Sequence, residues 1–169
     1  NRRKTVTEKG VWAFRIWIRQ GVATNKPYDQ FAAELMTAGG STLENPAANY
    51  FRIAREPKLV MENMTQVFLG TRFNCNQCHD HPFERWTQNQ YYELAAYFAD
   101  VGRRALPDGD EFVFTNALPV AVVNPSTNQA ASPKFPFEHA GTVDATAHRR
   151  EQLSQWLTAK ENPYFARSI

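Results

Sequence analysis

Two cysteines and a histidine within five consecutive residues are the part of the chain whose types and spacing suit redox or metal chemistry. Cys75 and Cys78 are separated by Asn76 and Gln77, and His79 follows directly. A C-x-x-C-H segment is typical of covalent haem attachment, in which both thiols bond to the porphyrin. The histidine then supplies the proximal nitrogen to the iron. The spacing therefore predicts one covalent haem c, held by Cys75 and Cys78, with His79 as iron ligand.

Other chemistries also use a cysteine pair at this spacing, among them zinc sites and thioredoxin-like redox pairs. A redox pair is typical of a strand–helix context, whereas the residues around this motif predict helices. A structural zinc site takes four ligands, so the two cysteines would need two of the four histidines. These are His79, His81, His139 and His148. Zinc stays the main alternative that the motif itself leaves open.

Large flat side chains and arginines flank the motif in the sequence. Around a haem, such rings exclude water and raise the reduction potential, although an ordinary hydrophobic core gives the same pattern. We expect Phe73, Phe83 and Trp86 to contact the haem. We expect Arg72 to bind a haem propionate, because a guanidinium forms two hydrogen bonds with a carboxylate. Arg85 is a second arginine suited to that role.

The second axial position of the iron has several interpretations. Met64 lies on a predicted helix before the motif, and a thioether ligand would raise the reduction potential. Methionines on an apolar helix face are more often core residues, so an open sixth position is an equal alternative. His81 follows His79 too closely to reach the opposite face of the porphyrin. A structural role or a place beside the iron suits it better.

The segments around the motif are predicted to be mainly helical. Apolar residues recur at helical spacing in residues 8–22, 27–39, 45–51, 57–70, 87–102 and from 144 onward. Thr87 with Gln90 forms a capping-box pattern. In the last segment, Leu153, Trp156 and Leu157 are expected to face inward.

Residues 103–140 differ in character, since they hold five of the ten prolines. Two β-prone runs, 111–115 and 119–123, predict a hairpin or extended flap. The fold class expected is mostly α: a helical c-type haem domain with a small β-hairpin or extended insertion near 103–140. We expect a haem domain over 1–102, a proline-rich linker over 103–140 and the start of a second helical domain over 141–169.

Charge and hydropathy exclude several classes of function. Nineteen basic and seventeen acidic residues leave a net charge of only +2, which argues against nucleic-acid binding. No apolar run approaches the roughly 18 residues that span a bilayer. Both cysteines of the chain lie in the motif, so they are not spent on a disulfide framework.

Residues 68–86 resemble the signature of planctomycete-type cytochrome c domains, which occur in large bacterial proteins with a CxxCHxHPF haem motif. Residues 25–31, 45–47 and 90–98 are similar to other parts of that family. Residues 148–169 are similar to the opening of a planctomycete-specific domain that follows it. The resemblance implies covalent haem on Cys75 and Cys78, His79 on the iron, and a periplasmic or otherwise exported location.

Two functions follow from a haem c in this setting. An electron-transfer protein or module would exchange electrons with redox partner proteins or with other domains of a longer chain. A haem enzyme, peroxidase-like or another oxidoreductase, would bind substrate at an open distal site, with His81 or an arginine supplying protons or charge. A structural zinc module is a remote third alternative. We expect electron transfer.

Overall fold

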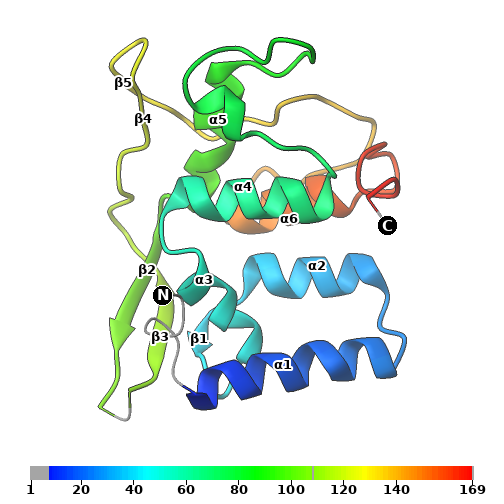
Figure 1. Cartoon of the computed structure of the whole chain (residues 1–169), viewed down its shortest axis with the longest axis vertical. Helices are drawn as coiled ribbons and strands as arrows, with labels where there is room; N and C mark the ends of the chain where they lie inside the picture. The colour runs from blue at the N-terminus through cyan, green and yellow to red at the C-terminus, as the bar shows by residue number, and fades with distance from the viewer. Residues whose placement is uncertain (1–7, 108, 169) are drawn as a thin grey trace.

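The computed structural model describes residues 8–107 and 109–168, and helices account for 44% of the chain (Figure 1). The helices are α1 (Glu8–Ala23), α2 (Tyr28–Thr37), α3 (Tyr50–Ile53), α4 (Pro57–Phe68), α5 (Gln88–Ala95) and α6 (Arg149–Thr158). Short 3-10 turns are η2 (Pro46–Asn49), η3 (Asn74–Gln77) and η4 (Ala96–Phe98). With two small antiparallel sheets, the fold is mixed α/β instead of mostly α as expected. The predicted helices and small β part are present, and the haem-domain part of the expectation stays a prediction.

Local sequence signals set most helix ends where they were predicted. Pro57 occupies the first turn of α4, where its missing N–H costs nothing. Gly70 follows that helix with φ +63°, a conformation that favours glycine. The predicted capping box of α5 is confirmed, because the Gln90 N–H donates to Thr87 Oγ1 and the Thr87 N–H donates to Gln90 Oε1.

The segment after α5 leaves the helix earlier than predicted. The 3-10 turn η4 ends at Phe98, and Gly102 belongs to strand β2 (Val101–Ala105) instead of ending a helix. A Cβ at position 102 would come within 2.6 Å of the Phe114 ring on the neighbouring strand. The glycine is therefore explained by close cross-strand packing.

The main sheet is three-stranded and antiparallel, in the order β1 (Gly40–Ser41), β3 (Glu111–Thr115), β2. The predicted strand over 111–115 is confirmed, but its expected hairpin with 119–123 is wrong. Its neighbours are β2, in the register Arg103↔Val113, and β1. Pro119 lacks the N–H that a ladder position needs. The second sheet pairs β4 (Val123–Asn124) with β5 (Gln129–Ala130).

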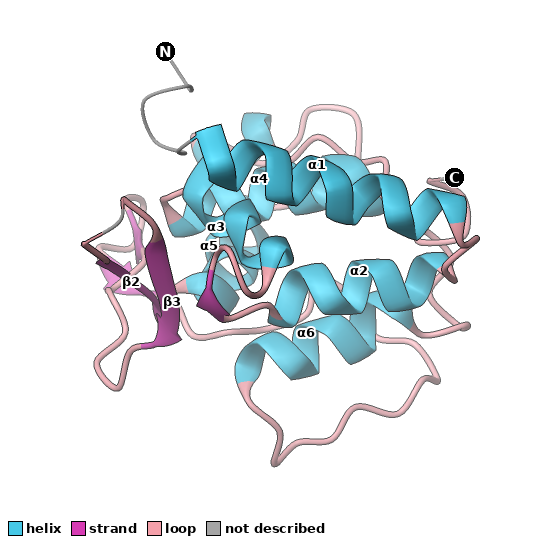
Figure 2. Cartoon of the chain, turned by 90° about the horizontal axis from the view of Figure 1, so that it is seen from below, coloured by secondary structure: helices cyan, strands magenta, loops and turns pink. Residues whose placement is uncertain are grey.

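The helices share one hydrophobic core. Helix α6 packs against α2, and α4 packs against α5 and η4 (Figures 1 and 2). Leu153, Trp156 and Leu157 of α6 are buried in this core, which confirms their inward orientation. The proposed division of the chain at 102/103 and 140/141 stays a prediction.

Candidate functional site

The C-x-x-C-H motif forms a single exposed turn between α4 and α5. Cys75 lies in η3, and the Cys78 N–H donates to the Cys75 carbonyl at 3.5 Å. Both thiols are free and exposed to solvent, and the His79 ring is exposed as well. Phe83 is 92% exposed on the same loop. Two thiols, an imidazole and an apolar ring are thus accessible from one short segment.

A buried amide holds this turn to the rest of its loop. Asn76, between the two cysteines, has no exposed surface, and its Nδ2 donates to the Trp86 carbonyl at 2.7 Å. The same carbonyl accepts the His81 N–H at 2.8 Å. These two hydrogen bonds join Asn76 and His81 to Trp86, so the buried side of the motif turn is held in place.

Helix α5 provides a second anchor for the turn. The Gln77 carbonyl accepts hydrogen bonds from the Tyr92 hydroxyl at 2.9 Å and from Gln88 Nε2 at 3.1 Å. In the other direction, the Gln88 N–H in the first turn of α5 donates to Asp80 Oδ1 at 2.7 Å. A carboxylate at a helix N-terminus is also favoured by the helix dipole. These contacts position the residues on both sides of Cys78 and His79.

The two motif histidines have different environments. His79 Nδ1 lies 2.6 Å from the Asp80 carbonyl oxygen. A carbonyl can only accept, so Nδ1 carries a hydrogen, and in the neutral ring the lone pair is then on Nε2. This tautomer suits a histidine that ligates a metal through Nε2 while its Nδ1–H is held by a carbonyl. His81 Nδ1 instead accepts the N–H groups of Phe83 and Glu84 at 3.3 and 3.0 Å, so His81 caps the turn that follows the motif.

Met64 lies in a different environment from the motif. Its side chain is fully buried in the hydrophobic core, whereas His79 is exposed. The face of α4 toward the motif is marked by Glu62, which accepts from Asn74 Nδ2 at 3.1 Å and from the Tyr91 hydroxyl at 2.6 Å. At 3.6 residues per turn, Met64 is rotated about 200° from Glu62 around the helix. The structure does not bring Met64 toward the motif face.

The predicted haem-contact residues divide into a buried and an exposed group. Phe73 and Trp86 are buried, with ring centroids 5.0 Å apart. Phe83 and Arg72 are exposed on the motif side. Arg85 is engaged elsewhere: its guanidinium lies 4.7 Å from the Trp86 ring centroid and also covers two rings of the C-terminal segment, Phe137 and Tyr164.

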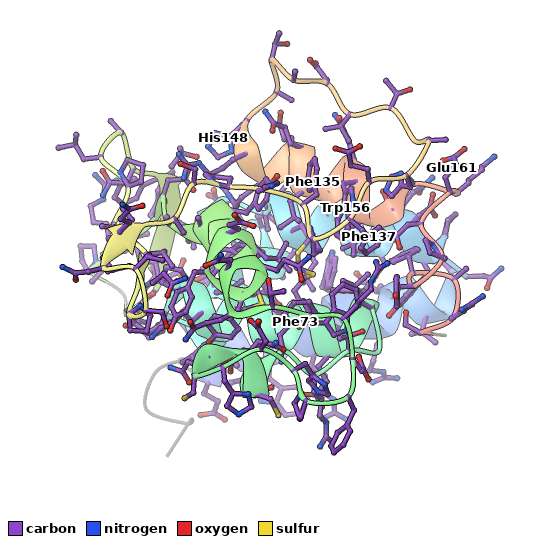
Figure 3. The ribbon with its side chains drawn as sticks, turned by 90° about the horizontal axis from the view of Figure 1, so that it is seen from above. Phe73, Phe135, Phe137, His148, Trp156 and Glu161 are labelled. Carbon is purple, nitrogen blue, oxygen red and sulfur yellow. The ribbon has the colours of Figure 1, made fainter. Side chains whose placement is uncertain are left out.

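This aromatic cluster connects the motif loop to the C-terminal part of the chain. The Trp86 ring lies 6.2 Å from Phe137. Phe137 in turn lies 4.8 Å from Trp156 of α6, and Figure 3 labels both of these rings. The Trp156 indole N–H donates to the Phe137 carbonyl at 3.1 Å. Residues far apart in sequence therefore support the underside of the motif loop.

The remaining histidines are committed to structural hydrogen bonds. His139 Nε2 is 2.9 Å from the Trp156 carbonyl, and its Nδ1 accepts the Gly141 N–H. His148 Nε2 is 2.8 Å from Asp100 Oδ2 at the start of α6. Within residues 8–107 and 109–168, no group of three or more His, Cys, Asp or Glu side chains is placed to hold a metal ion. The four-ligand zinc set is not assembled there.

Sequence reasoning missed the residues that support the motif. The side chains of Asn76, Gln88 and Tyr92 each donate a hydrogen bond to a backbone carbonyl of the loop, and such contacts leave no periodic signal. The one available hint was the type of Asn76, a polar residue between the two cysteines. Its burial depends on the position of Trp86, which the sequence alone does not give.

A family model described as "PSCyt2: Protein of unknown function (DUF1549)" matches residues 1–103. That match contains the motif turn, α5 and the first strand of the main sheet. No curated protein and no solved structure matches the chain. Across the described residues, no helix combines the length and the apolar character needed to cross a bilayer.

Proposed function

We propose that this chain, which belongs to the PSCyt2 family of unknown function (DUF1549), carries one covalent haem c and transfers electrons outside the cytoplasm. One observation carries the proposal. Cys75 and Cys78 are free, exposed and on the same turn as His79, whose Nδ1 is directed at the Asp80 carbonyl, so that Nε2 is the ring nitrogen left available to ligate a metal. This set of groups has the composition that a covalently attached haem requires.

Each residue of the motif has a distinct task in this proposal. The Cys75 and Cys78 thiols would each hold the haem by adding across a vinyl group, with sulfur bonding to one carbon and the thiol hydrogen to the other, so no oxidant would be consumed. His79 Nε2 would ligate the iron. When bound, the haem supplies a reversible one-electron couple. The Asp80 carbonyl keeps the His79 ring in the required tautomer.

Side chains around the turn support attachment in different ways. Phe83, which has almost no protein cover, offers an apolar surface to a ring system placed beside the thiols. The exposed Arg72 guanidinium is available for a propionate. The hydrogen bonds of Asn76 and Gln77 hold the turn so that both thiols keep their orientation during attachment.

One observation favours a haem enzyme as the second candidate. Met64 is buried on the core side of α4 and faces away from the motif, so the chain does not present this thioether to His79. An open sixth position would allow peroxide or another small ligand to bind. His81 is occupied as an acceptor of two backbone N–H groups, so a proton-donor role would require it to give up those bonds.

Covalent attachment is tested by producing the chain together with a cytochrome c maturation system in an exported compartment. We expect the reduced spectrum to retain its α-band after denaturation and acid–acetone extraction. Cys75→Ala or Cys78→Ala should leave a single thioether and shift that band, and the double variant should retain no haem. Absence of haem in the matured wild-type chain, or covalent haem in the double variant, would overturn the proposal.

Ligand addition then separates the two haem functions. An electron carrier should show a low-spin ferric spectrum that does not change when cyanide or peroxide is added. An enzyme should show a high-spin ferric spectrum that responds to both. His79→Ala should keep the covalent haem but change its spin state, since it removes the iron ligand without removing either thiol.

A further inference from the structure

Helix α1 has an outer face that no described element covers. It forms one end of the molecule along its long axis, and Figure 2 shows it uncovered from that side. Although the helix is rich in apolar residues, its fully buried residues are two glycines, Gly10 and Gly21. Val11, Trp12 and Ile16 are about half exposed, at 49%, 51% and 49%.

The inner face of α1 holds its partly buried aromatic residues, Phe14 and Trp17. Trp17 stacks on Phe31 of α2 with centroids 4.6 Å apart, and Phe14 stacks on Trp17 at 5.9 Å. Gly21 lies close to Phe31, which a Cβ would approach to 3.3 Å. Packing against α2 thus explains one face of the helix, and leaves Val11, Trp12 and Ile16 unexplained on the other.

The outer face of α1 also carries more basic than acidic side chains, since Lys9, Arg15 and Arg19 outnumber Glu8. Lys9, Arg15 and Arg19 are exposed, and none of them forms an ion pair within the described part of the chain. The Arg15 guanidinium lies 5.0 Å above the Trp12 ring. At 100° per residue, Arg15, Arg19, Trp12 and Ile16 fall within about one third of the helix circumference. The uncovered face therefore combines apolar side chains with unpaired cations.

We infer that this face of α1 binds the surface of an anionic phospholipid membrane without crossing it. A helix that lies in the membrane interface has apolar residues, including Trp, beside Lys and Arg. Each Lys or Arg near anionic headgroups adds favourable free energy of membrane binding, and Trp side chains are enriched at the membrane–water interface. A second copy of the same face is disfavoured, because the three cations of each chain would be brought together.

The position of α1 gives this docking a defined orientation. The segment between α4 and α5, which carries the motif turn, lies on the other side of α4 from α1 (Figure 1). A chain bound to a membrane through α1 would hold the motif away from the bilayer. The inference itself does not depend on haem, since it rests on residues of α1 alone.

Cosedimentation of the full chain with vesicles tests the inference. We expect binding to vesicles of 70% phosphatidylcholine and 30% phosphatidylglycerol, little binding to phosphatidylcholine alone, and release as NaCl is raised. Arg15→Gln with Arg19→Gln should weaken binding at least tenfold. Trp12→Ser with Ile16→Ser should weaken it similarly. None of the four side chains belongs to the buried core, so the variants should still fold, which a cooperative thermal transition checks.

A matched control uses exposed apolar residues from another part of the surface. Leu118 and Val120 are 81% and 64% exposed, and Leu118→Ser with Val120→Ser should bind vesicles like wild type. Cys75→Ala with Cys78→Ala should also bind, which separates this inference from the haem proposal. Equal binding to neutral and anionic vesicles, or variants in α1 that bind normally, would overturn it. So would a dimer that is lost in the Trp12/Ile16 variant.

Discussion

Asn76 Nδ2 donates a 2.7 Å hydrogen bond to the carbonyl of Trp86, and both residues are buried beneath an otherwise exposed loop. The bond ties the middle of the cysteine motif to the residue before α5 begins its capping box. The exposed chemistry of Cys75 and Cys78 is thereby supported by a residue that has no exposed surface at all.

Replacing Asn76 by Ala should lower the free energy of unfolding by about 1–3 kcal/mol, because a buried hydrogen bond is lost. Gln77→Ala is the matched control, since its side chain is exposed and only its carbonyl accepts hydrogen bonds. Urea denaturation of both variants measures the difference. Equal stability of the two variants would mean that the Asn76 bond does not hold the loop.

A buried ion pair joins the main sheet to α3. Arg52 NH1 lies 3.4 Å from Asp110 Oδ1, and both side chains are almost fully buried. Asp110→Ala should destabilise the fold by about 3–5 kcal/mol, because it leaves the buried guanidinium without this partner. Glu34→Ala removes the partner of Lys26 in a more exposed pair and should cost at most about 1 kcal/mol. Similar losses in the two variants would contradict this assignment.

Asp110 also predicts the response of the fold to acid. Burial alone would raise the pKa of this carboxyl, but hydrogen bonds from Thr42, Ser41 and backbone N–H groups outweigh it, so the pKa lies below its ordinary value. A carboxyl whose pKa is lower in the folded than in the unfolded chain stabilises the fold at pH values above its unfolded-state pKa, near 4. This stabilisation is lost as the pH falls through the folded-state pKa. Wild-type melting temperature should therefore drop below about pH 4. Asp110→Asn should show a smaller drop over the same range.

The sequence was sufficient for elements whose signals are local. Pro57, Thr87 and Gly70 mark helix ends because a missing N–H, a capping side chain and a positive φ act within one turn. The partner of β3 was not predictable in this way. Its pairing with Gly40 and Ser41 depends on side chains from distant segments meeting, including the hydrogen bond from Ser41 to Asp110.

In the candidate site, too, the sequence predicted what depends on local spacing and not what depends on distant contacts. Cys75, Cys78 and His79 were identified from spacing, and the structure places all three on one exposed turn. Phe73 and Phe83 have the same residue type and lie close in sequence, yet one is buried and the other is 92% exposed. Phe73 packs against Trp86, which in turn contacts Phe137 and Tyr164, and no local pattern encodes these contacts.

Tyr91 predicts the response to alkali. Burial raises the pKa of Tyr91, and the hydrogen bond to Glu62 raises it further; burial also raises the pKa of Tyr50 and Tyr97. A tyrosine whose pKa is higher in the folded than in the unfolded chain stabilises the fold at pH values below its unfolded-state pKa, near 10. This stabilisation is lost as the pH rises further. The melting temperature should fall above about pH 10. Tyr91→Phe should lose about 1 kcal/mol at pH 7 but show a shallower alkaline decline; a slope as steep as wild type would assign the decline to the other tyrosines.

Substitution of Phe83 tests whether this side chain contributes to haem binding or to the stability of the fold. Because the ring is 92% exposed, Phe83→Ala should change the free energy of unfolding of the haem-free chain by less than about 0.5 kcal/mol. Phe73→Ala, at a fully buried position, should cost about 3–5 kcal/mol. In the matured protein, loss of the Phe83 ring should expose the haem to water and lower its reduction potential, as measured by redox titration. If Phe83→Ala destabilises the haem-free chain or leaves the potential unchanged, the ring does not cover the haem.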